Sequence, residues 1–167
     1  MYLKIATFLA FVLSTNMAMA VGSTISGNVQ AKCSIHTDTA GVYGNPLPNK
    51  LDTTPSSGGT KASIRVDIAQ ANFYKLSVAT PTSFSSSPTL ADSVAWSGST
   101  VVGAVSASGM SAYEDAKVIS PANTTTFDMT LAGTTYFTVS STALYGYNKA
   151  FPAGTYNAVI EVTCIPK

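Results

Sequence analysis

The chain has few charged residues, two cysteines and one histidine, and each scarcity excludes a class of function. Asp, Glu, Lys and Arg make up 10% of its 167 residues. The basic side chains form no cluster that would attract a phosphate backbone, so we expect no nucleic-acid partner. His36 and the cysteines supply too few ligands for a zinc site, and no cofactor is expected.

Catalytic and ion-binding motifs are also missing. A triad would need His36 beside a serine and a carboxylate, and the many serines single out no nucleophile. We expect His36 to be an exposed loop residue just past the first strand. Glu114-Asp115 lacks the Asp-x-Asp-x-Asp spacing of a calcium loop, and no glycine-rich phosphate loop follows a strand. The chain is therefore not expected to be an enzyme or to hold a metal.

Long hydrophobic runs are absent except at the N-terminus. Lys4 is followed by an apolar run over 5–13 and by Ala18-Met19-Ala20, the small-x-small pattern that signal peptidase reads. The run is too short to span a bilayer comfortably, since a helix needs about 20 residues to do so. Residues 1–20 are predicted to be a signal peptide and 21–167 a single secreted domain without stable membrane insertion.

The expected mature chain has no formal net charge. Removing Lys4 from nine basic residues leaves eight, which balance eight acidic ones. Near-zero net charge favours association, so the composition suits a protein that packs against copies of itself. The alternative is that the chain is an ordinary small secreted β-domain.

Each cysteine lies in an alternating strand at one end of this domain. Period-two alternation places one set of side chains on the buried face of a sheet. The N-terminal set is Ile25, Val29, Ala31, Cys33 and Ile35, and the C-terminal set is Tyr156, Ala158, Ile160, Val162 and Cys164. In an oxidising compartment we expect a Cys33–Cys164 disulfide, which on the chain-entropy model contributes roughly 4.7 kcal/mol for a loop of about 100 residues.

The remaining pattern is one of short strands and turns. Strands are predicted over 61–69, 74–78, 124–131 and 134–140, with weaker candidates at 93–96, 103–107 and 117–119. The first two of these are close enough to suggest an antiparallel hairpin. Loops are expected at 38–59, 81–88 and 106–111, with one helical turn within 111–117. The pattern favours an all-β, immunoglobulin-like antiparallel β-sandwich, with a jelly roll or small barrel as the alternative.

The layout resembles that of fimbrial subunits of chaperone–usher pili, in the spore-coat-U-like or archaic branch. The matching features are the signal peptide, Cys33 in the first strand, and Gly154, Tyr156, Ile160 and Val162 around the last. The resemblance implies a subunit that lacks its last strand and polymerises by donor-strand exchange, for adhesion or biofilm formation. It implies a periplasmic chaperone, an outer-membrane usher and related subunits as partners, and a location at the cell surface.

In such a subunit the donor side chains would be Val21, Ile25 and Val29, which share one strand face. Two features depart from the family. The donor segment before Cys33 is short, and a cysteine in the terminal strand is unusual. Either the disulfide lies where the first and last strands converge, or the N-terminal strand completes its own domain.

The alternative function is a secreted, monomeric carbohydrate-binding or adhesive module. Tyr145 and Tyr147 lie between predicted strands, where ligand-binding loops usually occur, and are its candidate ligand contacts.

Overall fold

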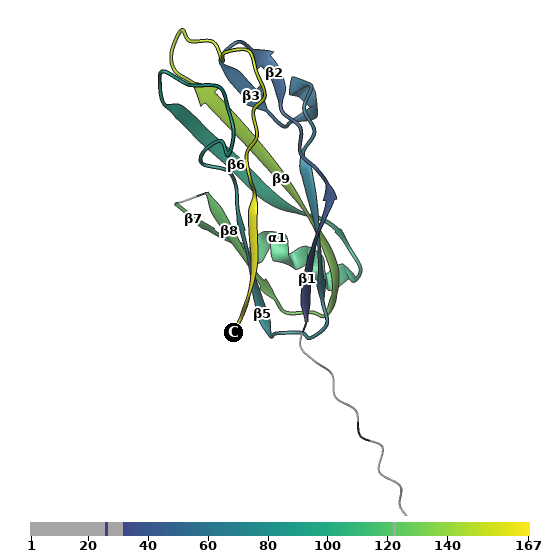
Figure 1. The fold of residues 1–167 in the computed structure, drawn as a ribbon. Coiled ribbons are helices and arrows are strands. Elements are labelled where there is room, and N and C mark those ends of the chain that lie inside the picture. Colours follow the sequence, from purple (N-terminus) through teal and green to yellow (C-terminus); the bar gives the residue numbers. More distant parts are fainter. Residues whose placement is uncertain (1–25, 27–31, 122) are drawn as a thin grey trace, which may run out of the picture.

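The computed structural model of the chain describes residues 26, 32–121 and 123–167. The predicted signal peptide and the predicted donor residues Val21, Ile25 and Val29 lie outside these residues. The described chain forms two antiparallel sheets packed against each other (Figure 1), which confirms the predicted all-β sandwich.

The strands are β1 (Cys33–Thr39), β2 (Gly44–Leu47), β3 (Lys50–Asp52), β4 (Ala62–Ile68), β5 (Tyr74–Ala79), β6 (Val94–Val105), β7 (Val118–Ser120), β8 (Thr124–Met129), β9 (Gly133–Tyr145) and β10 (Glu161–Pro166). The helical segments are η1 (Pro55–Ser57), η2 (Ser108–Ala112) and α1 (Tyr113–Ala116). Within the described part of the chain, no helix has the length and apolar character needed to cross a membrane.

Six of the described strands follow the order of an immunoglobulin sandwich, whereas β2, β3, β7 and β8 have no counterpart in that order. One sheet runs β1-β4-β9, with β6 on the other edge of β9. The short β3 pairs with the C-terminal end of β9, on the same edge as β4, and β2 pairs with β3. The second sheet runs β10-β5-β8-β7. The order β1-β4-β9-β6 corresponds to strands A-B-E-D of an immunoglobulin domain, while β5 and β10 correspond to C and F. No strand of the described residues occupies the position of G, beside β10.

The core lies between the two sheets and consists of the alternate residues of their central strands. Val66, Leu76 and Phe137 are fully buried, and the rings of Phe127 and Phe137 lie 4.6 Å apart. Polar residues occupy the intervening positions, so the period-two pattern of these segments directly sets which face packs inward.

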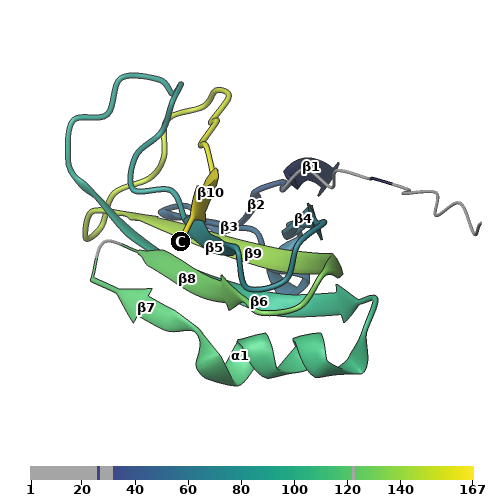
Figure 2. The same ribbon diagram turned by 90° about the horizontal axis from the view of Figure 1, so that it is seen from below.

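One side of the sandwich is closed by η2 and α1. Met110 and Tyr113 from these helices are buried in the core, and the Tyr113 hydroxyl accepts a hydrogen bond from the Leu131 amide at 2.9 Å. A Glu114 carboxylate oxygen accepts a hydrogen bond from the Val102 amide of β6 at 2.7 Å. Viewed from below, the helices lie along one side, and β1 and β10 lie at the opposite side (Figure 2).

Several sequence-based expectations need correction. The predicted hairpin of 61–69 and 74–78 is wrong, because β4 and β5 belong to different sheets. The candidates at 93–96 and 103–107 are parts of the single strand β6, whose Ser and Gly residues interrupt the hydrophobic pattern. The predicted loop 38–59 contains the hairpin β2–β3, which its prolines and glycines obscure.

Replacing a core ring tests this assignment of faces. Phe137→Ala removes a fully buried side chain from β9, and we expect it to lower the free energy of unfolding by about 3–5 kcal/mol. Leu144→Ala, at an exposed position of the same strand, should cost no more than about 1 kcal/mol. Urea denaturation followed by far-UV circular dichroism measures both, and similar losses for the two variants would contradict the assignment.

Candidate functional site

The first and last strands each pair along one edge only. β1 pairs with β4, and β10 pairs with β5. Within residues 32–121 and 123–167, no strand pairs with the other edge of either. An unpaired edge presents a row of backbone N–H and C=O groups that can form hydrogen bonds with another strand.

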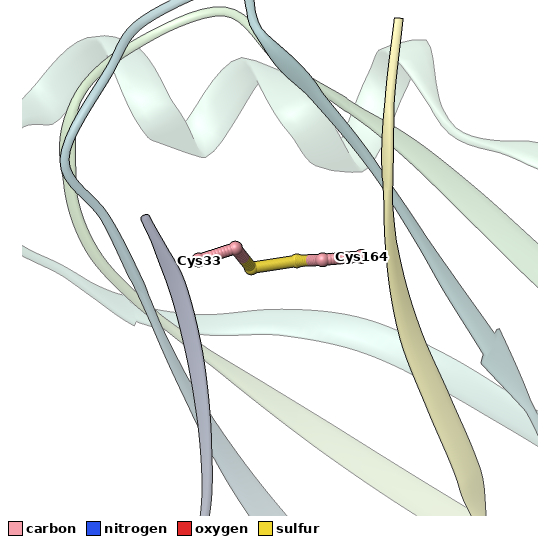
Figure 3. Close-up of a disulfide and its surroundings, with 2 residues drawn as sticks. All are labelled: Cys33 and Cys164. Carbon is pink, nitrogen blue, oxygen red and sulfur yellow. A yellow bond between two sulfur atoms is a disulfide. The ribbon is translucent and has the colours of Figure 1, made fainter. Parts of the chain in front are cut away.

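A disulfide joins these two strands at one end (Figure 3). Cys33 at the start of β1 and Cys164 near the end of β10 have Cα atoms 6.4 Å apart, within the usual range for a disulfide. The structure thus joins the pair that the sequence predicts, at a place where the two strands converge. A third strand between them would need about twice the interstrand spacing of 4.8 Å, which is more than this separation. The disulfide therefore closes this end.

Beyond the disulfide, β1 and the segment leading into β10 border a hollow of about 400 Å³, which we call the β1–β10 groove. Its lining comes from three parts of the chain. β1 contributes Ile35, Thr37 and Thr39, β4 contributes Ala62 and Ile64, and the C-terminal segment contributes Ala158, Ile160 and Val162. The groove thus has an apolar floor and two rows of alternating side chains on its walls.

The side chains on these walls are less buried than the sequence predicts. Ile35 is 37% exposed, and Cys33, Ile160, Val162 and Cys164 are only half-buried against the core. The predicted alternation is correct over 156–164, but the predicted burial is wrong for Ile35 and incomplete for the others. The cause is that no strand of the described residues covers this side of the sandwich.

The groove continues past Ala158 into a second hollow of about 430 Å³. Tyr43 and Leu51 lie on one side of it, and Gly154 and Tyr156 lie on the other. Gly154 has φ of 153°, and a Cβ there would lie 2.5 Å from Cγ of Pro88, so this position favours glycine. Among the described residues, no disulfide or strand pairing joins the two walls at this end of the groove, which we call the open end, and β2–β3 lies near it (Figure 1).

An ion pair lies within β3, near this end of the groove. The buried carboxylate of Asp52 accepts the Thr54 amide at 2.8 Å and contacts the Lys50 ammonium at 2.7 Å. Burial by itself would raise the pKa of Asp52, but the hydrogen bonds from Lys50 and Thr54 outweigh it and lower the pKa to about 2.

Aromatic side chains, most of them half-buried, pack together near the open end. Phe84, from the predicted loop 81–88, packs edge-on against Trp96 at 4.7 Å and Tyr156 at 5.0 Å. Phe151 stacks on Tyr145 at 5.2 Å. Sequence reasoning missed the role of Phe84 in this cluster, because it stands alone in a run of serines.

The two tyrosines singled out as ligand contacts lie in different environments. Tyr145 is buried, and its hydroxyl accepts the Ala91 amide at 2.9 Å. Tyr147 is 90% exposed. Because Tyr145 is 4% exposed, its ring packs against neighbouring side chains and offers little surface to a ligand.

The other candidate residues lie outside the groove. His36 is exposed and belongs to β1 rather than to a loop, with Nε2 3.6 Å from an Asp67 oxygen that Arg65 also contacts. In the part of the chain that the structure describes, no group of His, Cys, Asp and Glu could hold a metal ion.

Comparison of the chain with protein-family models and with curated proteins finds no match. A functional assignment therefore depends on the geometry of the groove.

The Asp52 contacts generate a pH-dependent prediction. A carboxylate whose pKa is lowered on folding stabilises the protein above its unfolded pKa of about 3.9, and this contribution is lost as pH falls through the folded value. Asp52→Asn should cost about 2 kcal/mol of unfolding free energy at pH 7 and much less near pH 2, where about half of the folded molecules already carry a protonated Asp52. Urea unfolding across this range measures the difference, with exposed Asp115→Asn as the control. A cost that stays constant with pH would contradict the role of the charge.

Proposed function

We propose that this chain is a structural subunit of a surface pilus that polymerises by donor-strand exchange. The observation that carries the proposal is a G position that no described strand occupies, where a groove with Ala62 and Ile64 at its floor runs between β1 and the segment leading into β10. A strand laid in this groove would add main-chain hydrogen bonds, and its alternate side chains would enter the gaps between the two sheets.

The segment before β1 has the pattern of such a strand. Val21, Ile25 and Val29 lie four positions apart, so in an extended segment their side chains point to the same side. Each aliphatic side chain that becomes fully buried contributes about 1.5–3 kcal/mol. Three of them, together with the hydrogen bonds of the strand, would give a persistent joint between copies.

An unfilled groove also accounts for the partners that we propose. Ile35 and two open strand edges would promote misassembly before the donor arrives. A periplasmic chaperone that occupies the groove and an outer-membrane usher that exchanges it for the next subunit would prevent this. The disulfide is compatible with passage through an oxidising compartment, and we propose the cell surface as the destination.

Two alternatives differ from this proposal in testable ways. A monomeric carbohydrate-binding module receives less support, because Tyr145 is buried and leaves Tyr147 without the predicted companion. In the second alternative, the N-terminal segment turns back at Lys32 and fills the groove of its own domain.

Charged substitutions in the donor segment separate these possibilities. Ile25→Asp with Val29→Asp places two carboxylates where the donor side chains would be buried, and burying an unpaired charge is strongly unfavourable. We expect the double variant to be secreted and folded but to form no polymers. Electron microscopy and immunoblots of periplasm and shed surface material measure the outcome.

A matched control carries the same added charge on the opposite strand face. Thr24→Asp with Asn28→Asp should leave polymers intact, because these positions alternate with the donor side chains. Polymers of normal length from the Ile25 and Val29 variant would refute donor-strand exchange. Loss of the folded monomer from the periplasm would instead favour self-completion.

A further inference from the structure

We infer that the side chains of Glu114 and Lys117 cap the outer edge of β6 and exclude other strands from it. β6 runs for 12 residues and, among the described strands, pairs only with β9. A strand edge without a neighbour presents backbone N–H and C=O groups to any extended chain nearby. β1 and β6 lie at opposite edges of the same sheet, so this cap is separate from the β1–β10 groove and goes beyond the proposed function.

Two hydrogen bonds attach these side chains to the edge of β6. A Glu114 carboxylate oxygen accepts from the Val102 amide at 2.7 Å, and the Lys117 ammonium donates to the Thr100 carbonyl at 3.2 Å. In an antiparallel strand, residues two positions apart direct their backbone groups to the same side. One acceptor and one donor therefore lie where a neighbouring strand would offer its own carbonyl and amide.

The pair is held in place from both sides of the edge. The Lys117 ammonium also contacts the Glu114 carboxylate, and the Lys117 side chain is 17% exposed. Burial by itself would raise the pKa of Glu114, but the hydrogen bonds from Lys117 and from the Val102 amide outweigh it and lower the pKa. Between the two side chains along α1 and its end, the buried Tyr113 anchors the helix in the core.

Removing the cap would leave backbone groups of β6 without their partners. Thr100 is 1% exposed, so water has little access to its carbonyl once the Lys117 ammonium is gone. A buried backbone group without a hydrogen bond is unfavourable, and pairing with another strand would restore the bond. The uncapped edge should therefore accept an extended segment of a second copy.

Two other edges of the described sheets carry different obstacles to pairing. β2 contains Pro46, which has no backbone N–H to donate. β7 has only three residues, and a very short edge strand is a poor template for another chain. β6 is long and has no proline, so Glu114 and Lys117 supply the protection that its sequence lacks.

Photo-crosslinking at Val101 tests the cap in the full chain. Val101 lies between the two bonded residues and is 37% exposed, so a benzophenone amino acid there reports a second strand at this edge. Glu114→Leu with Lys117→Met removes the acceptor and the donor, and we expect at least tenfold more covalent dimers through position 101. Glu114→Gln with Lys117→Arg keeps an acceptor and a donor and should leave the yield at the parental level.

Amide exchange gives a second measurement that a change in overall stability does not reproduce. In dilute protein, Glu114→Leu should speed hydrogen–deuterium exchange of the Val102 amide at least tenfold relative to that of Val139 on the central strand β9, whereas Glu114→Gln should not. Asp115→Leu with Lys149→Met removes one charge of each sign from exposed positions. This matched control should change neither the exchange at Val102 nor the crosslinking yield.

Dimers through position 101 that increase only when the cap is removed, together with faster exchange at Val102, support the inference. A yield that Glu114→Leu with Lys117→Met leaves unchanged, or an equal increase in the matched control, overturns it. If that double variant does not fold, Lys117→Met alone carries the same comparison. These readouts do not involve the donor segment, so their failure is distinguishable from loss of polymers in the test of the proposed function.

Discussion

The arrangement depends on one covalent constraint, the disulfide between the first and last strands. Cys33 and Cys164 are separated by 131 residues and belong to different sheets, and among the described strands β1 pairs only with β4 and β10 only with β5. In a complete immunoglobulin sandwich, strand G would pair with the open edge of β10. In the described part of the chain no strand takes that place, and the disulfide joins the two walls of the β1–β10 groove at one end only.

The two sides of the sandwich differ in how they are sealed. η2 and α1 close one side with Met110 and Tyr113, and the backbone amides of Val102 and Leu131 donate hydrogen bonds to the side chains of Glu114 and Tyr113. On the other side, Ile35 is exposed and the side chains of Ile160 and Val162 are only half-buried. The low charge of the chain agrees with this asymmetry, because a surface with little net charge does not oppose association between copies.

Sequence patterns predicted the features that depend on local periodicity. The strands β4, β5 and β8 were recognisable because alternate residues such as Val66, Leu76 and Phe127 reach the core. The disulfide was predictable because only one pair of cysteines exists. Periodicity does not identify the neighbour of a strand, however, so the hairpin predicted between β4 and β5 was wrong.

Features that depend on distant parts of the chain were also missed. The hairpin β2–β3 is short and proline-rich, and β3 pairs with the end of β9. The cluster around Phe84 joins segments far apart in sequence. The groove itself could not be read from alternation, which predicted that Ile35 is buried, because alternation shows which side chains face inward but not whether another strand covers them.

Backbone amide exchange tests the central claim most directly. If a strand from another copy fills the groove, amides on the open edges of β1 and of 158–165 gain hydrogen-bond partners when the protein assembles. Hydrogen–deuterium exchange should therefore be slower at these amides in assembled than in unassembled protein, while the buried amides of β4 and β9 change little. Equal exchange along β1 and 158–165 in the two states would contradict the account.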